Sequence, residues 1–301
     1  MVVDCAIIGG GPAGLNAALV LGRARRSVLV FDDNQPRNAV THESHGFLTR
    51  DGVAPGEFRE LGRREIGKYP SVALRQARIT SVSSQEGVFA LVGDDGAAAQ
   101  AHTIILATGL RESLPAIPGI HDYYGTSLFS CPYCDGWELR DKPLVVIAED
   151  GQRAFHMAKV VWNWSRDLLL CANGHTILSA EQKSTLLRNG IRVVEDAITA
   201  LVGTNGALER VVFASGEDSA REGGFVVSPL SQASDVAARL GCEMNAQGNI
   251  VIDELGRTSV PGVYAAGDAA GMAPAQLVIA AAAGSRAAAG VNMDLIDRAF
   301  L

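Results

Sequence analysis

Short apolar runs separated by helical patterns recur along the chain. They cover residues 3–8, 27–31, 103–107, 144–147, 168–171 and 263–266. Runs of this length without alternating polar positions are typical of strands that are buried on both faces of a parallel sheet. The order of strand-like and helix-like segments predicts an α/β, doubly wound architecture.

The first run leads into a glycine-rich turn, a helical segment and the second run, which is the pattern of a βαβ unit. In a dinucleotide-binding unit the first glycine permits a tight turn, the second lets a pyrophosphate approach the backbone, and the third lets helix and strand pack closely. An acidic residue after the second strand accepts a hydrogen bond from a ribose hydroxyl. We expect this site to contain Gly9, Gly11, Pro12, Ala13, Gly14 and Asp32. The alternative is a glycine-rich turn in an ordinary α/β protein, and the loop alone does not distinguish FAD from NAD.

Two further segments change the interpretation of this loop. Residues 107–109 read Ala-Thr-Gly, and residues 258–268 end in a buried run followed by Gly267 and Asp268. Together with the N-terminal loop they resemble the two-dinucleotide-domain flavoproteins, in which such an aspartate binds the ribityl–pyrophosphate part of FAD. The resemblance adds Thr108, Gly109, Gly267 and Asp268 to the expected FAD site. A turn or helix-cap aspartate is the alternative for Asp268.

The length of 301 residues favours two domains. Residues 111–119 contain two prolines and read as a linker, a second βαβ-like pattern starts at Lys142, and the pattern changes again over 228–234. We therefore predict a discontinuous domain, residues 1–115 and 231–301, that binds FAD. A second Rossmann-like domain, residues 116–230, is inserted into it.

Composition excludes several classes of function. A net charge of −7 argues against nucleic acid or an anionic membrane as the main partner. Five cysteines are an odd number and too few for a secreted disulfide framework. The N-terminal apolar stretch carries Asp4 and lacks a preceding basic region, and the alanine-rich stretch 280–289 is interrupted by polar residues. We expect a cytoplasmic protein without a membrane span.

The segment Cys131-Pro132-Tyr133-Cys134-Asp135 carries the most chemistry. Cysteines three residues apart can close a small disulfide, and a turn or helix start lowers the pKa of a thiol. A zinc site needs four ligands, and the chain has no second Cys-x-x-Cys, so we expect a redox-active pair and no metal. Asp135 is either a general acid and base or a turn aspartate. The remaining cysteines are expected to be small buried hydrophobic residues, namely Cys5, Cys171 and Cys242.

The sequence resembles the low-molecular-weight thioredoxin reductases over essentially its whole length. The motifs GGGPAG, ATG, CPYCDG and TSVPGVYAAGD occur in the order and spacing of that family. The resemblance implies FAD, a homodimer and electron transfer between flavin and the cysteine pair. It further implies that Cys134 faces the flavin, Cys131 exchanges with the external thiol or disulfide, and Asp135 donates the proton. Gln276 matches a position whose segment packs near the flavin ring.

In this family the loop 38–51 approaches the flavin, and here it holds His42 and His45. His45 is a candidate base for a substrate thiol, and an ordinary loop histidine is the alternative. The three tryptophans either line a substrate pocket or pack in a core or interface, and packing is favoured. They are Trp137, Trp162 and Trp164.

The inserted domain departs from the family pattern. A thioredoxin reductase carries a second glycine loop for NADPH, whereas the matching positions here are Ala148, Glu149 and Asp150. Their side chains occupy the pyrophosphate space and two carboxylates oppose its charge. The arginine-rich segment that binds the 2′-phosphate is also missing after residues 168–171, where the chain continues Ala-Asn-Gly-His.

This loss of the NADPH site resembles the gliotoxin/holomycin-type dithiol oxidases. The resemblance implies that the protein oxidises a small dithiol to a disulfide and passes the electrons to oxygen, with peroxide as product. The alternative is a thioredoxin reductase-like enzyme that acts on a thioredoxin-like protein, with ferredoxin, reduced flavin or NADPH as donor.

Overall fold

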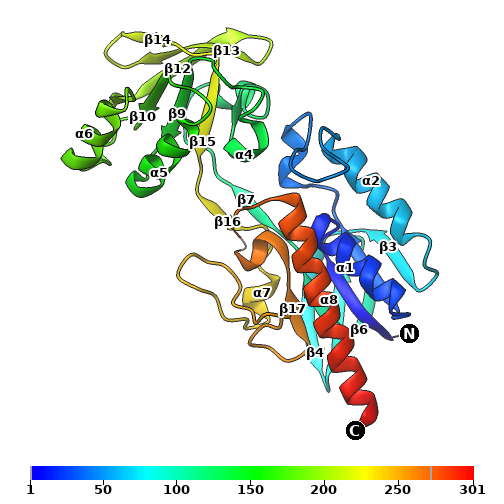
Figure 1. Ribbon diagram of the computed structural model, residues 1–301. Coiled ribbons are helices and arrows are strands. Elements are labelled where there is room, and N and C mark those ends of the chain that lie inside the picture. Colours follow the sequence, from blue (N-terminus) through cyan, green and yellow to red (C-terminus); the bar gives the residue numbers. More distant parts are fainter. Residues whose placement is uncertain (1, 272) are drawn as a thin grey trace. The chain divides into compact units, whose positions relative to one another are not determined.

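The computed structural model describes residues 2–271 and 273–301. The chain divides into two compact units. Unit 1 comprises Met1–Ala39, Gly46–Arg111 and Ser231–Leu301, and unit 2 comprises Val40–His45 and Glu112–Leu230. Figure 1 shows the elements of both units along the chain.

A seven-stranded sheet forms the centre of unit 1, in the order β3-β2-β1-β6-β5-β4, with β17 also paired to β6. Its strands are β1 (Val2–Ile8), β2 (Val28–Asp32), β3 (Val72–Gln76), β4 (Ile79–Gln85), β5 (Val88–Gly93), β6 (Ala98–Leu106) and β17 (Val263–Ala265). The strands β1, β2, β3, β6 and β17 pair in parallel, whereas β4, β5 and β6 form an antiparallel meander. The parallel part is the half of the sheet that can present strand ends to a dinucleotide.

Alternation along β1 explains why its second half, Cys5–Ile8, is apolar at every position. Cys5 and Ile7 belong to one buried cluster, and Ala6 and Ile8 belong to another. Successive side chains of a strand point to opposite faces of the sheet. The sheet is therefore covered on both sides, as the continuous apolar run predicts.

Helices α1 (Pro12–Arg23) and α8 (Leu277–Phe300) lie side by side in unit 1 (Figure 1). Pro12 occupies the first turn of α1, where its missing N–H costs nothing. Gly284 lets the helices approach to backbone contact, because a Cβ at this position would lie 2.0 Å from the Ala13 carbonyl oxygen. The other helical segments of the unit are α2 (Pro55–Ile66), α7 (Val236–Arg239) and the 3-10 turn η2 (Gly267–Ala270), with η1 (Arg37–Val40) at its boundary.

Unit 2 contains a five-stranded parallel sheet in the order β11-β10-β9-β15-β8. Its strands are β8 (Leu128–Phe129), β9 (Leu144–Ala148), β10 (Leu168–Cys171), β11 (Arg192–Val194) and β15 (Gly223–Val227). A separate antiparallel sheet consists of β12 (Ile198–Thr204), β13 (Ala207–Phe213) and β14 (Asp218–Ala220). The helices are α3 (Ile120–Tyr123), α4 (Pro132–Asp135), α5 (Gly151–Val161) and α6 (Ala180–Arg188).

Two short strands lie in the segments that connect the units. They are β7 (Leu110–Glu112) and β16 (Leu230–Gln232), and they pair with each other. The expected α/β fold with two Rossmann-like domains is confirmed. The antiparallel meander and the β12–β14 sheet are additions that the apolar runs do not indicate.

The contact between α1 and α8 generates a stability prediction. Gly284→Ala should lower the free energy of unfolding by roughly 1–3 kcal/mol, because the new methyl group overlaps the backbone of Ala13. Gly56→Ala in α2 is the matched control, since a Cβ there meets nothing within 4 Å. The control should stay within about 0.5 kcal/mol of wild type or exceed it. Chemical denaturation of both variants measures the difference, and equal stabilities would contradict this packing.

Candidate functional site

The carboxyl ends of neighbouring parallel strands bring three of the sequence motifs together in unit 1. The Gly9 N–H donates to the Phe31 carbonyl (2.8 Å) at the end of β2. The Ala107 N–H donates to Ile8 (2.8 Å), and the Ala266 N–H donates to Leu106 (3.0 Å). The glycine loop, the Ala-Thr-Gly segment and the Gly-Asp segment therefore lie along one edge of the sheet, where open α/β sheets bind their ligands.

The three glycines of the loop meet different surroundings. Gly9 has φ +114°, and a Cβ there would lie 2.2 Å from the Ala107 carbonyl oxygen. A Cβ on Gly14 would lie 1.9 Å from the Gly9 oxygen. A Cβ on Gly11 would meet nothing within 4 Å. Packing therefore requires glycine at positions 9 and 14. At Gly11 the backbone is open on one side, and a Cβ would fill this space. A dinucleotide pyrophosphate needs such an open approach to the backbone.

Asp32 at the end of β2 is 7% exposed. Its Oδ2 atom lies 2.7 Å from Arg63 Nη2 and 3.7 Å from Arg59 Nη1, both on α2. Within the described residues, the Nε atoms of both arginines are buried and make no hydrogen bond. Burial lowers the pKa of Arg59, and the Asp32 charge opposes that effect. These arginines were not among the predicted site residues, although their spacing of four residues on one helix face was a usable signal.

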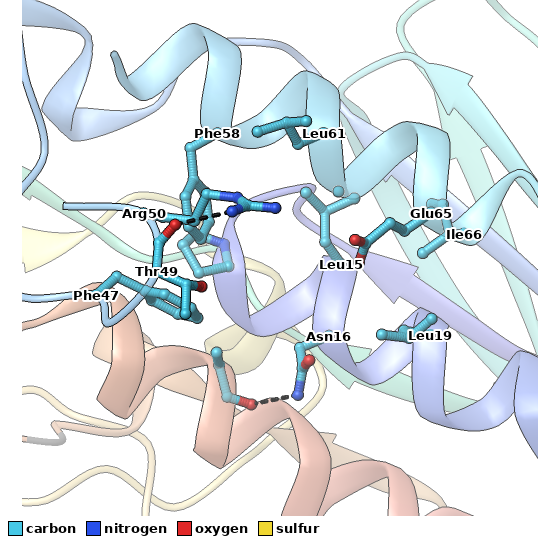
Figure 2. A pocket seen from close by; sticks show the side chains of 13 residues that line it. Leu15, Asn16, Leu19, Phe47, Thr49, Arg50, Phe58, Leu61, Glu65 and Ile66 are labelled. Atoms are coloured by element: carbon cyan, nitrogen blue, oxygen red, sulfur yellow. Dashed lines mark hydrogen bonds between the residues drawn. The ribbon is translucent and has the colours of Figure 1, made fainter. Parts of the chain in front are cut away.

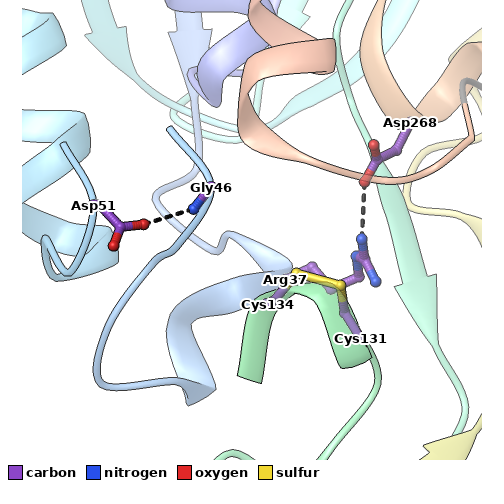
Figure 3. Close-up of a disulfide and its surroundings, with 6 residues drawn as sticks. All are labelled: Arg37, Gly46, Asp51, Cys131, Cys134 and Asp268. Carbon is purple, nitrogen blue, oxygen red and sulfur yellow. Dashed lines mark hydrogen bonds and ion pairs between the residues drawn. A yellow bond between two sulfur atoms is a disulfide. The ribbon is translucent and has the colours of Figure 1, made fainter. Parts of the chain in front are cut away.

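Asp268 is held by an ion pair within unit 1. Its Oδ2 atom accepts a hydrogen bond from Arg37 Nη2 at 2.9 Å (Figure 3). Gly267 has φ +72°, and a Cβ there would lie 3.0 Å from Ala13 Cβ, so this segment lies directly against the start of α1. Gln276 is the N-cap residue of α8 and makes no capping bond through its side chain.

The Ala-Thr-Gly segment follows β6 directly. Gly109 has φ +69° and open space at its Cβ position, and its carbonyl oxygen accepts a hydrogen bond from the Ala233 N–H at 3.2 Å. Thr108 lies between this glycine and Ala107, whose N–H is bonded to β1. The expected FAD residues of unit 1 are therefore adjacent to the same strand ends.

A pocket of about 200 Å³ opens beside α1 within unit 1 (Figure 2). Apolar side chains of α1, α2 and residues 47–50 form most of its wall, with Asn16 and Arg50 among the polar members. Asn16 Nδ2 donates to the Ala281 carbonyl of α8 at 2.8 Å. Of the expected FAD residues, Pro12 is among those that line this pocket.

The cysteine pair lies at the start of a short helix in unit 2. Cys131 and Cys134 form a disulfide with a Cα–Cα distance of 5.3 Å (Figure 3). Cys131 is the N-cap residue of α4, and its carbonyl accepts hydrogen bonds from the N–H groups of Cys134 and Asp135, each at 3.1 Å. Both cysteines are partly exposed, so the disulfide is accessible to an attacking thiolate.

Asp135 and His45 belong to one cluster of ionisable groups in unit 2. Burial raises the pKa of Asp135 to about 7; the charge of His45 lowers it and the charge of Glu138 raises it. His45 Nε2 lies 3.5 Å from Glu43 Oε2 and 4.0 Å from Glu138 Oε1. A carboxyl group that titrates near neutral pH is suited to take up and release protons beside a thiol. Glu43 and Glu138 were not among the predicted site residues.

The loop after β9 is the counterpart of the glycine loop, and its two carboxylates accept hydrogen bonds from other groups of the chain. Asp150 is the N-cap of α5, and its Oδ1 atom accepts the Arg153 N–H at 2.8 Å. Glu149 Oε1 accepts a hydrogen bond from Asn173 Nδ2 at 2.7 Å. The first-turn N–H group that would face a phosphate is already bonded to a protein carboxylate.

The remaining cysteines are free and buried, as expected. Burial raises the pKa of Cys5 and of Cys171 to about 12 and also raises that of Cys242, so none of them is a reactive thiolate. Within residues 2–271 and 273–301, His, Cys, Asp and Glu side chains form no group of three or more that could hold a metal ion. No described helix is both long and apolar enough to cross a bilayer.

The tryptophans have different environments. Trp162 is half-buried and donates from Nε1 to the Asn189 carbonyl at 2.9 Å, and Trp164 packs against α4. Trp137 is 65% exposed, so it does not pack in the core of the described chain, and its packing in an interface stays a prediction.

A disulfide on a helix start, with a near-neutral acid beside it, and a dinucleotide cradle define a flavin-linked thiol–disulfide oxidoreductase. The family model described as pyridine nucleotide-disulphide oxidoreductase matches residues 3–284. The chain belongs to this family. It is an FAD-dependent enzyme of the thioredoxin reductase-like type, and the resemblance drawn from its motifs is confirmed.

Known proteins resemble the chain over nearly its full length. The Aspergillus oryzae protein named thioredoxin reductase aclD is 31% identical over 97% of this chain and 96% of its own length. The crystal structure of the putative thioredoxin reductase TrxB from Bacillus anthracis matches with a TM-score of 0.95 and 45% identity, covering 98% of this chain and 99% of that one. The crystal structure of HlmI matches with a TM-score of 0.92 and 36% identity, covering 98% and 93%.

The environment of Asp135 generates a prediction on stability and pH. In the unfolded chain the carboxyl ionises at its ordinary pKa of 3.8, whereas in the folded chain it ionises near pH 7. The folded state therefore loses stability as the pH rises from about 4 to about 7. Asp135→Asn removes this penalty and should be more stable than wild type by about 1–2 kcal/mol at pH 8, after allowance for partial exposure, with no gain near pH 4. Urea unfolding of the oxidised proteins at both pH values measures it, and a pH-independent difference would contradict the shift.

Proposed function

We propose that the protein oxidises a small dithiol to a disulfide without using NADPH, and that oxygen is the electron acceptor. The observation that carries the proposal is the α5 start, where the Asp150 carboxylate caps the helix and Glu149 lies beside it. A dinucleotide phosphate would have to displace one carboxylate and approach another, which is electrostatically unfavourable. The redox pair and its acid are nevertheless intact, so the enzyme retains thiol–disulfide chemistry.

In the proposed cycle, a substrate thiolate attacks Sγ of Cys131, the disulfide breaks, and Cys134 leaves as a thiolate. The second substrate thiol then attacks the substrate sulfur of this mixed disulfide, which closes the product disulfide and releases Cys131. The two protons lost by the substrate pass to the protein and solvent. Asp135, assisted by His45, takes up a proton at its carboxylate, because its pKa lies close to the working pH.

FAD is assigned to unit 1 by the residues that would hold it. The open cradle at Gly11 and the first turn of α1 would take the pyrophosphate, Asp32 a ribose, and Asp268 the ribityl–pyrophosphate part. FAD held there would supply a two-electron carrier for reoxidation of the cysteine pair, with oxygen as the final acceptor and hydrogen peroxide as the product. The domain assignment, residues 1–115 and 231–301 for FAD and 116–230 for the cysteine pair, is part of the proposal.

The proposal extends to assembly and location. A homodimer is the state that the family resemblance implies. The three free buried cysteines are in keeping with a reducing cytoplasm. The alternative function is reduction of a thioredoxin-like protein, which is favoured by the names of relatives such as thioredoxin reductase aclD.

Gly11→Val tests the cofactor assignment. The variant should fold, because φ of −79° suits any residue and a Cβ meets nothing within 4 Å. It should lose at least about tenfold in FAD occupancy, because the side chain fills the space for the pyrophosphate. Flavin absorbance per mole of protein gives the occupancy, circular dichroism verifies the fold, and Gly56→Ala serves as the FAD-replete control. A folded variant with full FAD would contradict the assignment.

Peroxide release tests the function. Wild-type enzyme should form hydrogen peroxide from dithiothreitol in air without nicotinamide, and Cys131→Ser should abolish it. Cys242→Ala, at a buried cysteine outside the pair, should retain it. Anaerobic NADPH should leave the flavin absorbance unchanged. If the enzyme makes no peroxide with any dithiol but reduces thioredoxin when ferredoxin or reduced flavin is supplied, the alternative function is correct.

A further inference from the structure

Two arginines of α2 lie near the carboxylate at the end of β2 in unit 1. The side chains of Arg59 and Arg63 are 12% and 27% exposed, and that of Asp32 is 8% exposed. Arginine is rarely buried to this extent unless its charge is paired. One buried carboxylate therefore faces two guanidinium groups, and these two groups differ in how they are bonded.

Arg63 is bonded to the loop that follows β2. Its Nη2 atom donates to Asp32 Oδ2 at 2.7 Å and to Asn34 Oδ1 at 3.0 Å. The Asn34 N–H in turn donates to Asp32 Oδ1 at 3.2 Å. These three bonds fix the orientation of the carboxylate. Because a carboxylate can accept about four hydrogen bonds, about two acceptor positions of Asp32 remain for a ligand.

Arg59 differs from Arg63 in its hydrogen bonding. Its Nη1 atom lies 3.7 Å from Asp32 Oδ2, which is too far for a hydrogen bond, and no hydrogen bond joins its guanidinium to another described residue. Its Nε atom is buried. A buried polar group without a hydrogen bond costs free energy, so this guanidinium indicates a site where a ligand supplies the missing acceptor.

The glycine loop lies directly beside this cluster. A Cβ on Gly10 would lie 2.6 Å from both Cγ and Oδ2 of Asp32, so the carboxylate is in contact with the backbone of the loop. The next residue, Gly11, is the one with open space at its Cβ position. In a dinucleotide the adenosine ribose is attached to the pyrophosphate. Its hydroxyl groups are therefore within reach of Asp32 and Arg59 when the pyrophosphate lies at Gly11.

We propose that Arg59 and Arg63 complete the subsite for the adenosine ribose of FAD. Arg63 is a positioning residue that holds the Asp32 carboxylate in the orientation that accepts a ribose hydroxyl. Arg59 is a binding residue that donates to the oxygen of such a hydroxyl. A hydroxyl group donates one hydrogen bond and also accepts, so it can bridge a carboxylate and a guanidinium that are too far apart to bond directly. The inference rests on the assignment of FAD to unit 1 in the proposed function and is independent of the dithiol reaction.

A matched pair of nucleotides isolates the contribution of the ribose hydroxyls. ADP and 2′,3′-dideoxy-ADP share adenine and pyrophosphate and differ only in these hydroxyls. Calorimetry measures the affinity of each for the full-length protein stripped of FAD, whose fold is verified by circular dichroism. Wild type should bind ADP at least about tenfold more tightly than the dideoxy nucleotide, because the latter cannot make the hydrogen bonds to the charged groups. Arg59→Met and Arg63→Met should each reduce this ratio to about twofold.

Three further variants separate positioning from a general loss of charge or of fold. Arg64→Met removes an exposed arginine of the same helix and should leave the ratio unchanged. Arg63→Lys keeps a positive charge beside Asp32 and should recover part of the ratio. The double variant Asp32→Asn with Arg63→Met should have the ratio of Asp32→Asn alone, because Arg63 acts through the carboxylate.

The ratio of the two affinities decides the inference. A ratio that stays at about tenfold in Arg59→Met and Arg63→Met would overturn it, even if both nucleotides bind more weakly, because the arginines would then only fasten α2 to the sheet. Wild type that binds both nucleotides equally or binds neither, or an equal loss of the ratio in Arg64→Met, would also overturn it. Failure of the proposed function is measured separately, by peroxide release for the dithiol reaction and by the occupancy of Gly11→Val for the FAD assignment.

Discussion

Backbone-to-backbone contact around the start of α1 constrains everything else in unit 1. Gly9, Gly14 and Gly284 each leave less than 2.5 Å between a would-be Cβ and a backbone carbonyl oxygen, those of Ala107, Gly9 and Ala13. Because no side chain stands between the backbones at these glycines, the start of α1 lies close to the ends of β1 and β6 and to α8. Gly11 is the exception, because its position is open, and so the same packing that fixes the loop leaves one face of it free for a ligand.

The two strand–turn–helix loops of the chain have the same topology and opposite electrostatics. The α1 start has Gly11 as N-cap with no side-chain capping bond, so its first N–H groups are left for an anion. The α5 start has Asp150 as N-cap with its carboxylate bonded to the Arg153 N–H. The positive end of the α1 dipole is therefore free to attract a phosphate, whereas the positive end of the α5 dipole already faces the Asp150 carboxylate.

The fold and the loops could be predicted from the sequence because short-range rules determine them. Apolar runs predict strands that are buried on both faces. The spacing of Gly9, Gly11 and Gly14 is that of a dinucleotide-binding turn between a strand and a helix. The partners of Asp32 and His45 were not predictable in this way. Arg63 meets Asp32 across 31 residues of sequence, and Glu138 meets His45 across 93, so no local pattern pairs them. The exposure of Trp137 was not predictable either, because its residue type favours burial, whereas this residue follows the short helix α4 at the surface of the chain.

Three aspartates show how environment, rather than residue type, determines the chemistry of the site. Asp32 is buried but faces two arginines, so its carboxylate is compensated and available as an acceptor. Asp150 caps α5, and its carboxylate accepts a hydrogen bond from the Arg153 N–H. Asp135 is half-buried, and no arginine is among the charges that shift its pKa; burial outweighs the opposing charge of His45, so its pKa rises to about 7. Proton transfer beside the disulfide therefore depends on the lack of a strong cationic partner for Asp135. Such a partner would lower the pKa of this carboxyl again and keep it ionised at neutral pH.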